Sequence, residues 1–262
     1  MSELDARYER GQDTRRMFGG GAITDPGAMG DAWELAPDLE RLLGEALFGS
    51  IWHREALTSA QREIITLSTL VVRGRDPQLR RHLGNALNIG LTPEQIVELI
   101  IHATWYGGAP AGLNALALCK SVFEERGVAF TLPTRHDAQE TPDHLFERGN
   151  QLRLQYMGDQ PGARPAPPTQ AERDFGRISG EYYWGATWTR PGLDLPSRCL
   201  CTMTCLAALG RHSPLRTHIR AALNIGFTQD QIIEVFMHLM FYGGIPFARE
   251  AIDVANEIFI NG

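Results

Sequence analysis

The amino-acid sequence predicts an all-α protein made of two homologous helical bundles. Three observations support this prediction: one segment occurs twice, apolar residues recur at helical spacing in both copies, and little of either copy alternates as a strand would. The duplicated segments are residues 79–110 and 215–246. We expect each copy alone to leave an apolar face uncovered, and therefore expect the two to pack as a pseudo-symmetric pair.

The two copies share polar as well as apolar residues. Both contain Leu-Arg-x-His, Ala-Leu-Asn-Ile-Gly, Thr-x-x-Gln-Ile-x-Glu and His-x-x-x-Tyr-Gly-Gly-x-Pro, in that order. A hydrophobic pattern alone would keep only the apolar positions, so identical His, Asn, Gln and Tyr residues indicate a duplicated unit. A Trp-x-Arg and a Glu-Arg-Gly motif extend the match toward the start of each copy. The predicted domains are residues 1–130 and 131–262, called here the first and second repeat.

A helical hairpin is the first element that the apolar spacing defines. Apolar residues recur at helical intervals over residues 57–72, and the same stripe continues over residues 79–87 after a break that contains Gly74 and Pro77. Asn-Ile-Gly then ends the second helix, because glycine readily adopts the left-handed backbone of a helix C-terminus.

The next helix is predicted from its cap. Thr92 offers an N-cap hydroxyl, Pro93 fits the first helical position, and Gln95 completes a capping box. The helix should run to the Gly-Gly pair after Tyr106, and a further helix should span residues 110–125. With the corresponding segments of the second copy, each repeat is expected to contain roughly five to seven helices.

Three segments lack helical periodicity. The glycine-rich residues 19–30 and the proline-rich residues 158–169 lie at equivalent places in the two repeats. Each is either a plain surface loop or a lid or interface arm, since long irregular segments in compact domains often have such roles. Residues 127–141 are the expected linker between the repeats.

Composition and charge exclude several functions. The 262 residues carry a formal net charge of −6 and contain no basic run, so we do not expect the protein to bind nucleic acid. No stretch is long and apolar enough to span a membrane, and the acidic start does not match a signal peptide, so we expect a cytoplasmic protein. The four cysteines lack CxxC spacing and are expected to be reduced and packed as small apolar side chains.

Four histidines are the candidate chemical groups. His82 and His218 lie mid-helix at equivalent positions, and His102 and His238 lie one turn before Tyr106 and Tyr242, respectively. A single histidine on such a helix is often a hydrogen-bonded core residue. Both copies nevertheless kept these residues, while Glu63 of the first repeat became Cys199 in the second.

The Gly-Gly pairs offer a second kind of site. Gly108 and Gly244 directly precede a helix, whose free amides and dipole favour an anion. The alternative is a tight corner that needs glycine for its backbone alone. No HExxH, GxSxG or helix-opening GxGxxG motif is present, and no His and carboxylate set has metal-ligand spacing. Acid–base chemistry without a metal or other cofactor is therefore what we expect of an enzyme here.

The longest motifs are in the second repeat: Tyr183 to Leu193, Ala207 to Arg211, Leu215 to Asn224 and Tyr242 to Pro246. With these motifs the sequence resembles the carboxymuconolactone decarboxylase family, a branch of the alkylhydroperoxidase D-like all-helical superfamily. The resemblance covers almost the whole chain as a tandem fusion. It implies a cofactor-free enzyme and a homo-oligomer, for example three chains that form six pseudo-equivalent units.

The resemblance also implies what the sites do. The peroxidase branch uses a CxxC motif before the histidine, and this chain has no cysteine there, which excludes dithiol peroxide reduction. The same branch uses a Glu–His proton relay, matched by Glu63 and His82. In the namesake reaction, loss of carbon dioxide from a butenolide leaves a furanolate anion, so a donor must stabilise oxygen and an acid must protonate carbon. His82 or His218 would be that acid.

Other residues would bind the substrate. Cationic and amide groups for its carboxylates are Arg80, Arg216 and Arg220 and the amides that follow Gly108 and Gly244, and further contacts are expected from Trp52, Trp188, His102, His238, Tyr106 and Tyr242. The first repeat has Gly84 where the second has Arg220. For a dianionic substrate we therefore expect His218 to matter more than His82.

The leading hypothesis is a decarboxylase that acts by proton transfer and enolate stabilisation on a small acidic or lactone substrate. Two alternatives remain open. One is a cofactor-free isomerase, cyclase or lactone-forming or ring-opening enzyme that uses the same histidines. The other is a non-catalytic binding or assembly protein, which the change of Glu63 to Cys199 would fit.

Overall fold

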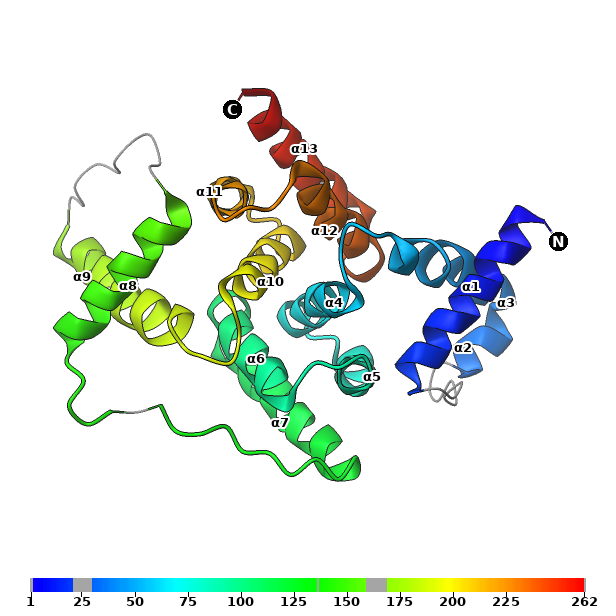
Figure 1. Ribbon diagram of the computed structural model, residues 1–262, viewed down its shortest axis with the longest axis horizontal. Helices are drawn as coiled ribbons and strands as arrows, with labels where there is room; N and C mark the ends of the chain where they lie inside the picture. The colour runs from blue at the N-terminus through cyan, green and yellow to red at the C-terminus, as the bar shows by residue number, and fades with distance from the viewer. Residues whose placement is uncertain (1, 21–29, 136, 159–168, 262) are drawn as a thin grey trace.

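A computed structural model describes residues 2–20, 30–135, 137–158 and 169–261, and within these ranges the chain is helical with no strand (Figure 1). The predicted all-α class is therefore confirmed. The described part contains no helix that combines the length and the apolar character needed to cross a membrane. The predicted irregular segments 19–30 and 158–169 lie mostly outside the described residues.

Each repeat begins with a long helix, continues through a π-helix, and ends with four helices in the same order. The first repeat contains α1 (Glu3–Phe18), α2 (Gly30–Leu35), α3 (Pro37–Leu43), the π-helix η2 (Gly44–Phe48), the 3-10 helix η3 (Ile51–His53), α4 (Ser59–Arg73), α5 (Asp76–Asn88), α6 (Pro93–Gly107) and α7 (Ala109–Glu125). The second contains α8 (Pro142–Met157), α9 (Gln170–Ile178), the π-helix η4 (Ser179–Trp188), α10 (Leu195–Ala208), α11 (His212–Asn224), α12 (Gln229–Tyr242) and α13 (Ile245–Asn261).

Local signals set the helix ends as predicted. Thr92 and Thr228 form reciprocal capping boxes with Gln95 and Gln231 at the starts of α6 and α12. Gly74 ends α4 in the left-handed region, with φ of 59°. The predicted linker has no regular secondary structure over residues 128–135.

The N-terminal helix of each repeat is an arm that packs on its own π-helix and hairpin. α1 contacts η2 and α5, and α8 contacts η4 and α11. At Gly11 a Cβ atom would lie 2.3 Å from the Gly44 carbonyl oxygen, and at Gly149 it would lie 2.5 Å from that of Gly180. The glycine of the repeated Glu-Arg-Gly motif is therefore required by close backbone contact.

The two bundles share one continuous hydrophobic core. α4 packs against α10 at the centre of the molecule, α6 of the first repeat also contacts α10, and α12 of the second contacts α4 (Figure 1). Fully buried residues of both repeats, such as Leu67 and Leu200, belong to the same cluster. The pair is therefore interlocked, and each bundle covers the apolar faces of the other.

Two buried glutamates cross between the repeats. Glu234 of α12 binds Arg54 and Arg62 of the first repeat, with 3.0 Å between Glu234 Oε2 and Arg62 Nη2. In the symmetric cluster Glu98 of α6 binds Arg190 and Arg198 of the second repeat. Arg190 Nη2 lies 2.8 Å from Glu98 Oε1, and Arg198 Nη2 lies 3.3 Å from Glu98 Oε2.

These clusters lie in the protein interior. Arg62 and Glu98 are fully buried, and burial lowers the pKa of both Arg62 and Arg198. A buried ion without its partner is strongly destabilising. The crossed clusters therefore fix how the two bundles pack.

We predict that Glu234→Ala and Glu98→Ala each lower the free energy of unfolding by about 3–5 kcal/mol, because each leaves a buried arginine without its counter-charge. Urea denaturation measures this loss. Glu124→Ala is the matched control, since Glu124 pairs with Lys120 on the surface and its removal should cost less than about 0.5 kcal/mol. A loss no larger than that of the control would contradict the assigned role of the crossed clusters.

Candidate active site

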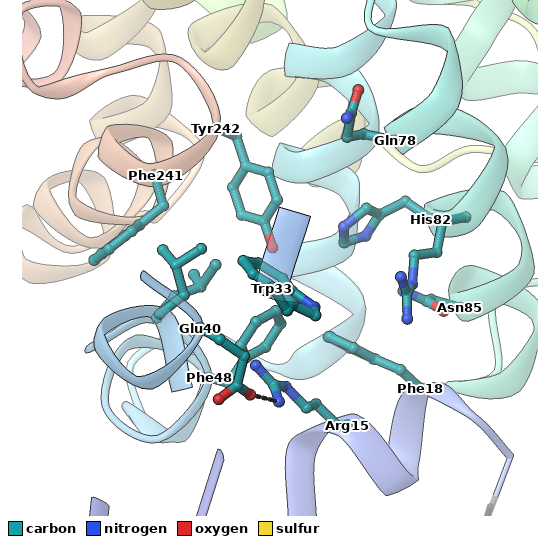
Figure 2. A pocket seen from close by; sticks show the side chains of 13 residues that line it. Arg15, Phe18, Trp33, Glu40, Phe48, Gln78, His82, Asn85, Phe241 and Tyr242 are labelled. Carbon is teal, nitrogen blue, oxygen red and sulfur yellow. Dashed lines mark hydrogen bonds and ion pairs between the residues drawn. The ribbon is translucent and has the colours of Figure 1, made fainter. Parts of the chain in front are cut away.

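A cavity of about 440 Å³ lies in the first repeat beside His82 (Figure 2). Its lining comes from α1, α2, α3, η2 and α5 of the first repeat and from the end of α12 of the second. The two repeats therefore build this cavity together, and Phe241 and Tyr242 are the contribution of the second repeat.

His82 is held by a buried carboxylate. Its Nδ1 lies 2.8 Å from Oε1 of Glu63, which projects from α4 and is fully buried. This contact fixes the orientation of the ring and leaves Nε2 as the nitrogen through which His82 can act on a ligand in the cavity that it lines. Glu63 also supplies a counter-charge for a protonated imidazole. The predicted pairing of Glu63 with His82 is thus present in the structure.

Tyr242 faces His82 from the opposite repeat (Figure 2). The two ring centres are 5.3 Å apart, and Trp52 Nε1 donates a hydrogen bond to the Tyr242 hydroxyl over 3.3 Å. Burial raises the pKa of Tyr242, so its hydroxyl stays protonated and can donate to a ligand oxygen. A histidine and a neutral hydroxyl donor therefore meet at one cavity.

The wall of the cavity also contains an ion pair. Arg15 of α1 binds Glu40 of α3, and the Arg15 guanidinium lies 5.0 Å from the centre of the Phe48 ring (Figure 2). Phe18, at the end of α1, packs edge-on against Trp52 with 4.6 Å between ring centres. The N-terminal arm is thus part of the site, which the repeated motifs did not indicate.

The equivalent site in the second repeat is built differently. The Tyr156 hydroxyl lies 2.9 Å from His218 Nδ1 and 3.3 Å from Cys199 Sγ, so it occupies the place of the Glu63 carboxylate. Tyr156 ends its arm as Phe18 ends the other. The carbonyl of each accepts a hydrogen bond from an equivalent asparagine, Asn88 or Asn224.

Aromatic rings enclose His218. Trp184 and Trp188 stack on its ring with centre distances of 6.5 and 6.2 Å, and Tyr156 is fully buried. Burial lowers the pKa of His218 to about 3 and raises that of Cys199 to about 12. Both groups are therefore neutral near pH 7, and the partner of the His218 Nδ1 atom is a hydroxyl where His82 has a carboxylate.

His102 and His238 lie in the core between the repeats. The Nε2 atoms of His102 and His238 lie 2.9 Å from the hydroxyls of Thr202 and Thr66, which belong to the opposite repeat, and both rings are fully buried. Desolvation holds the pKa of each far below its usual value. Neither ring lines the cavity, so the structure does not bring these two predicted substrate contacts to it.

The predicted arginines also lie away from the cavity lining. Arg80 pairs with Glu125, Arg216 pairs with Glu257, and Arg220 is exposed on α11. Arg80 and Arg220 are two positions from the histidine of their helix, and such residues project from a different face. Among the described residues, the cations that line the cavity are Arg15 and Arg81. Arg81 is three positions after Gln78 and four before Asn85, so it lies on the same face of α5 as these two lining residues.

The remaining predicted residues divide between the two sites and the helix corners. Trp52 packs beside the site of the first repeat, and Trp188 packs beside that of the second. The Tyr106 hydroxyl lies 2.6 Å from the Thr202 hydroxyl, near the site of the second repeat. Gly108 and Gly244 have φ of 84° and 104° at the starts of α7 and α13, outside the cavity lining. Glycine is therefore needed there for the backbone of a corner.

The cysteines lie apart from this cavity. All four are buried and free, and burial raises the pKa of the Cys119 thiol to about 12. Over the ranges that the structure describes, no group of three or more His, Cys, Asp or Glu residues is arranged to hold a metal ion.

Comparison with known proteins identifies the family. The family model described as the carboxymuconolactone decarboxylase family matches the chain twice, over residues 37–121 and 173–257. The chain therefore belongs to this family and contains it in tandem. The two arms, with Arg15, Phe18 and Tyr156, lie outside the matched residues.

Curated relatives correspond to about one repeat. The 4-carboxymuconolactone decarboxylase of Acinetobacter baylyi is 34% identical over 118 residues, which are 45% of this chain and 88% of the relative. The nitrosuccinic acid decarboxylase of Metarhizium robertsii is 32% identical over 116 residues, or 43% of this chain and 80% of the relative. An uncharacterized 15.0 kDa protein of Paracoccus denitrificans is 34% identical over 94 residues, or 35% and 70%.

The buried histidines predict how stability depends on pH. His102, His218 and His238 have lowered pKa values in the folded state, whereas the unfolded chain protonates near the ordinary value of 6.5. Below that pH the unfolded state binds more protons, so the free energy of unfolding falls with acidification, by up to about 1.4 kcal/mol per pH unit for each histidine.

Urea denaturation between pH 7.5 and 5.5 measures this dependence. His238→Gln should reduce its slope, whereas His144→Gln, at an exposed histidine, should leave it unchanged. A stability that does not change over this interval would contradict the burial of neutral imidazoles.

Proposed function

We propose that the chain is a decarboxylase that removes carbon dioxide from an organic acid or lactone by proton transfer at the His82 site. The observation that carries this proposal is the cavity at which His82, held by Glu63, faces the Tyr242 hydroxyl. The family and the printed names of two relatives, both decarboxylases, support the reaction class.

The chemistry matches the groups at the cavity. When a substrate carboxylate leaves as carbon dioxide, the carbon–carbon bond breaks and its electron pair stays on the substrate, spread onto a conjugated oxygen. A hydrogen bond from the Tyr242 hydroxyl stabilises that oxygen. A proton from His82 Nε2 then forms the new carbon–hydrogen bond, and solvent returns a proton to the ring.

Glu63 acts through His82. Its carboxylate accepts from Nδ1–H, so the ring keeps one orientation while the proton leaves Nε2. The electron pair is delocalised within the substrate itself, so this sequence of steps balances without a redox partner or an additional electron sink.

The geometry favours the first repeat as the working one. The sequence predicted a larger role for His218 because Arg220 could bind a substrate carboxylate. In the structure Arg220 is exposed and is not among the cavity residues. His218 instead contacts the Tyr156 hydroxyl among stacked tryptophan rings, and its lowered pKa keeps the ring neutral near pH 7, which makes it a weak acid. We therefore propose the reverse order, with His82 as the acid.

A second candidate reaction uses the same groups. An isomerase or cyclase also needs an acid and a donor to an enolate oxygen, and the pairing of His82 with Tyr242 supplies both. The two reactions differ in their product, because only the decarboxylase releases carbon dioxide.

We predict that His82→Ala lowers turnover by about 10²-fold or more, the contribution typical of a general acid, while His218→Ala leaves it near the wild-type value. The measurement is carbon dioxide release from γ-carboxymuconolactone and from 3-oxo acids of differing size, above the uncatalysed rate. Circular dichroism confirms that each variant is folded.

Each other outcome has a defined meaning. If His218→Ala abolishes release and His82→Ala does not, the working site is in the second repeat. If no acid releases carbon dioxide but the protein exchanges substrate protons for deuterium, the isomerase or cyclase is favoured. Neither activity with any substrate would favour a non-catalytic binding protein.

A further inference from the structure

One wall of the cavity is a polar stripe on α5. Gln78, Arg81, His82 and Asn85 all line the cavity, and their spacing places them on one helical face. A ligand edge that carries oxygen atoms can accept hydrogen bonds from this stripe, with the guanidinium of Arg81 suited to a carboxylate.

The rest of the cavity lining is mostly apolar. Phe18, Trp33, Phe48 and Phe241 contribute aromatic rings (Figure 2). Leu43 and Leu47 add aliphatic surface. A cavity of about 440 Å³ with such a lining has the size and character of sites that enclose ligands larger than a short-chain diacid. A small dianion would leave most of this apolar surface without a contact.

The charge of the site also disfavours a dianion. The described lining contains two arginines, Arg15 and Arg81, and one carboxylate, Glu40, which binds Arg15. Glu63 adds a further carboxylate directly behind His82. Over the described residues the arginines therefore do not outnumber the carboxylates, so burial of a doubly charged anion would leave an excess of negative charge.

The second repeat lacks the polar stripe. Pro214, Thr217 and Ala221 stand at the positions equivalent to Gln78, Arg81 and Asn85. Phe18 and Arg15 also belong to the arm outside the residues that match the family. The polar stripe, Arg15 and Phe18 are therefore particular to the first repeat and its arm.

We infer that the first site binds an apolar organic acid of at least bicyclic aromatic size with a single carboxylate, its oxygen-bearing edge against α5 and its ring system against the aromatic wall. This substrate class deepens the proposed function and rests on it. Arg81 sets specificity for the carboxylate, and Phe241 sets specificity for the ring system.

Calorimetric titration of the full chain with 2-naphthoate and with glutarate tests the inference. Neither probe is expected to react, so binding is measured apart from turnover. We expect 2-naphthoate to bind once per chain and at least about tenfold more tightly than glutarate. Arg81→Thr introduces the residue found at the equivalent position of the second repeat. It should lower the affinity for 2-naphthoate by about tenfold or more, as loss of a charged hydrogen bond does.

Phe241→Ala should also lower the affinity for 2-naphthoate by about tenfold, and it should leave the affinity for glutarate unchanged. The matched control is Thr217→Ala, at the position equivalent to Arg81, which should leave the affinity unchanged. Circular dichroism and thermal unfolding establish that each variant is folded. Tighter binding of glutarate, or an affinity for 2-naphthoate that neither Arg81→Thr nor Phe241→Ala changes, would overturn the inference.

The results separate the substrate class from the reaction. Binding of 2-naphthoate as described, without carbon dioxide release from any acid, would support the inferred ligand class and contradict the decarboxylase. Carbon dioxide release with a preference for small diacids would support the decarboxylase and overturn the ligand class.

Discussion

The structure depends on the two buried glutamates that each repeat extends into the other. Glu234 places α12 against α4 through Arg62, and Glu98 places α6 against α10 through Arg198. Because α12 also ends in Tyr242, the same contact positions a tyrosine of the second repeat beside His82 of the first. Both repeats therefore line the cavity beside His82. This explains why the crossed residues stay the same in both copies while the residues around the two histidines differ.

The two histidine sites have the same place in their repeats but differ in the residues around them. In the first repeat a carboxylate holds the histidine beside a cavity, whereas in the second a tyrosine hydroxyl holds it among tryptophan rings. Filling a site with aromatic side chains stabilises a core, since each buries a large apolar area. A tandem protein can thus keep one site for chemistry while the other adds to the stability of the shared core. The change of Glu63 to Cys199 is accompanied by the change of Phe18 to Tyr156, so the histidine never loses its partner.

Much of the fold could be predicted from the sequence because its signals are local. Capping boxes, glycine stops and apolar spacing predicted the helices from α4 to α7, and the duplication predicted a pseudo-symmetric pair. The contact of Glu63 with His82 was also expected. The contacts of Phe18 and Tyr156 with the histidines could not be found in this way, because these residues are far from the histidines along the chain and lie outside the Glu-Arg-Gly motif that the two arms share. Arg80, Arg216 and Arg220 were chosen by motif without regard to helical phase, and the structure places them away from the cavity lining.

The claim that one site works, and that the other repeat completes it, is tested most directly by comparing Tyr242→Phe with Tyr106→Phe. The two tyrosines are equivalent in sequence, and each substitution removes only a hydroxyl. The measurement is the kcat for carbon dioxide release from an acid that the wild-type protein turns over, in folded protein. We expect Tyr242→Phe to lower kcat by about 10²-fold, as loss of a donor to a developing oxyanion does, and Tyr106→Phe to leave it unchanged. Equal losses for both variants, or a loss for Tyr106→Phe alone, would contradict the account.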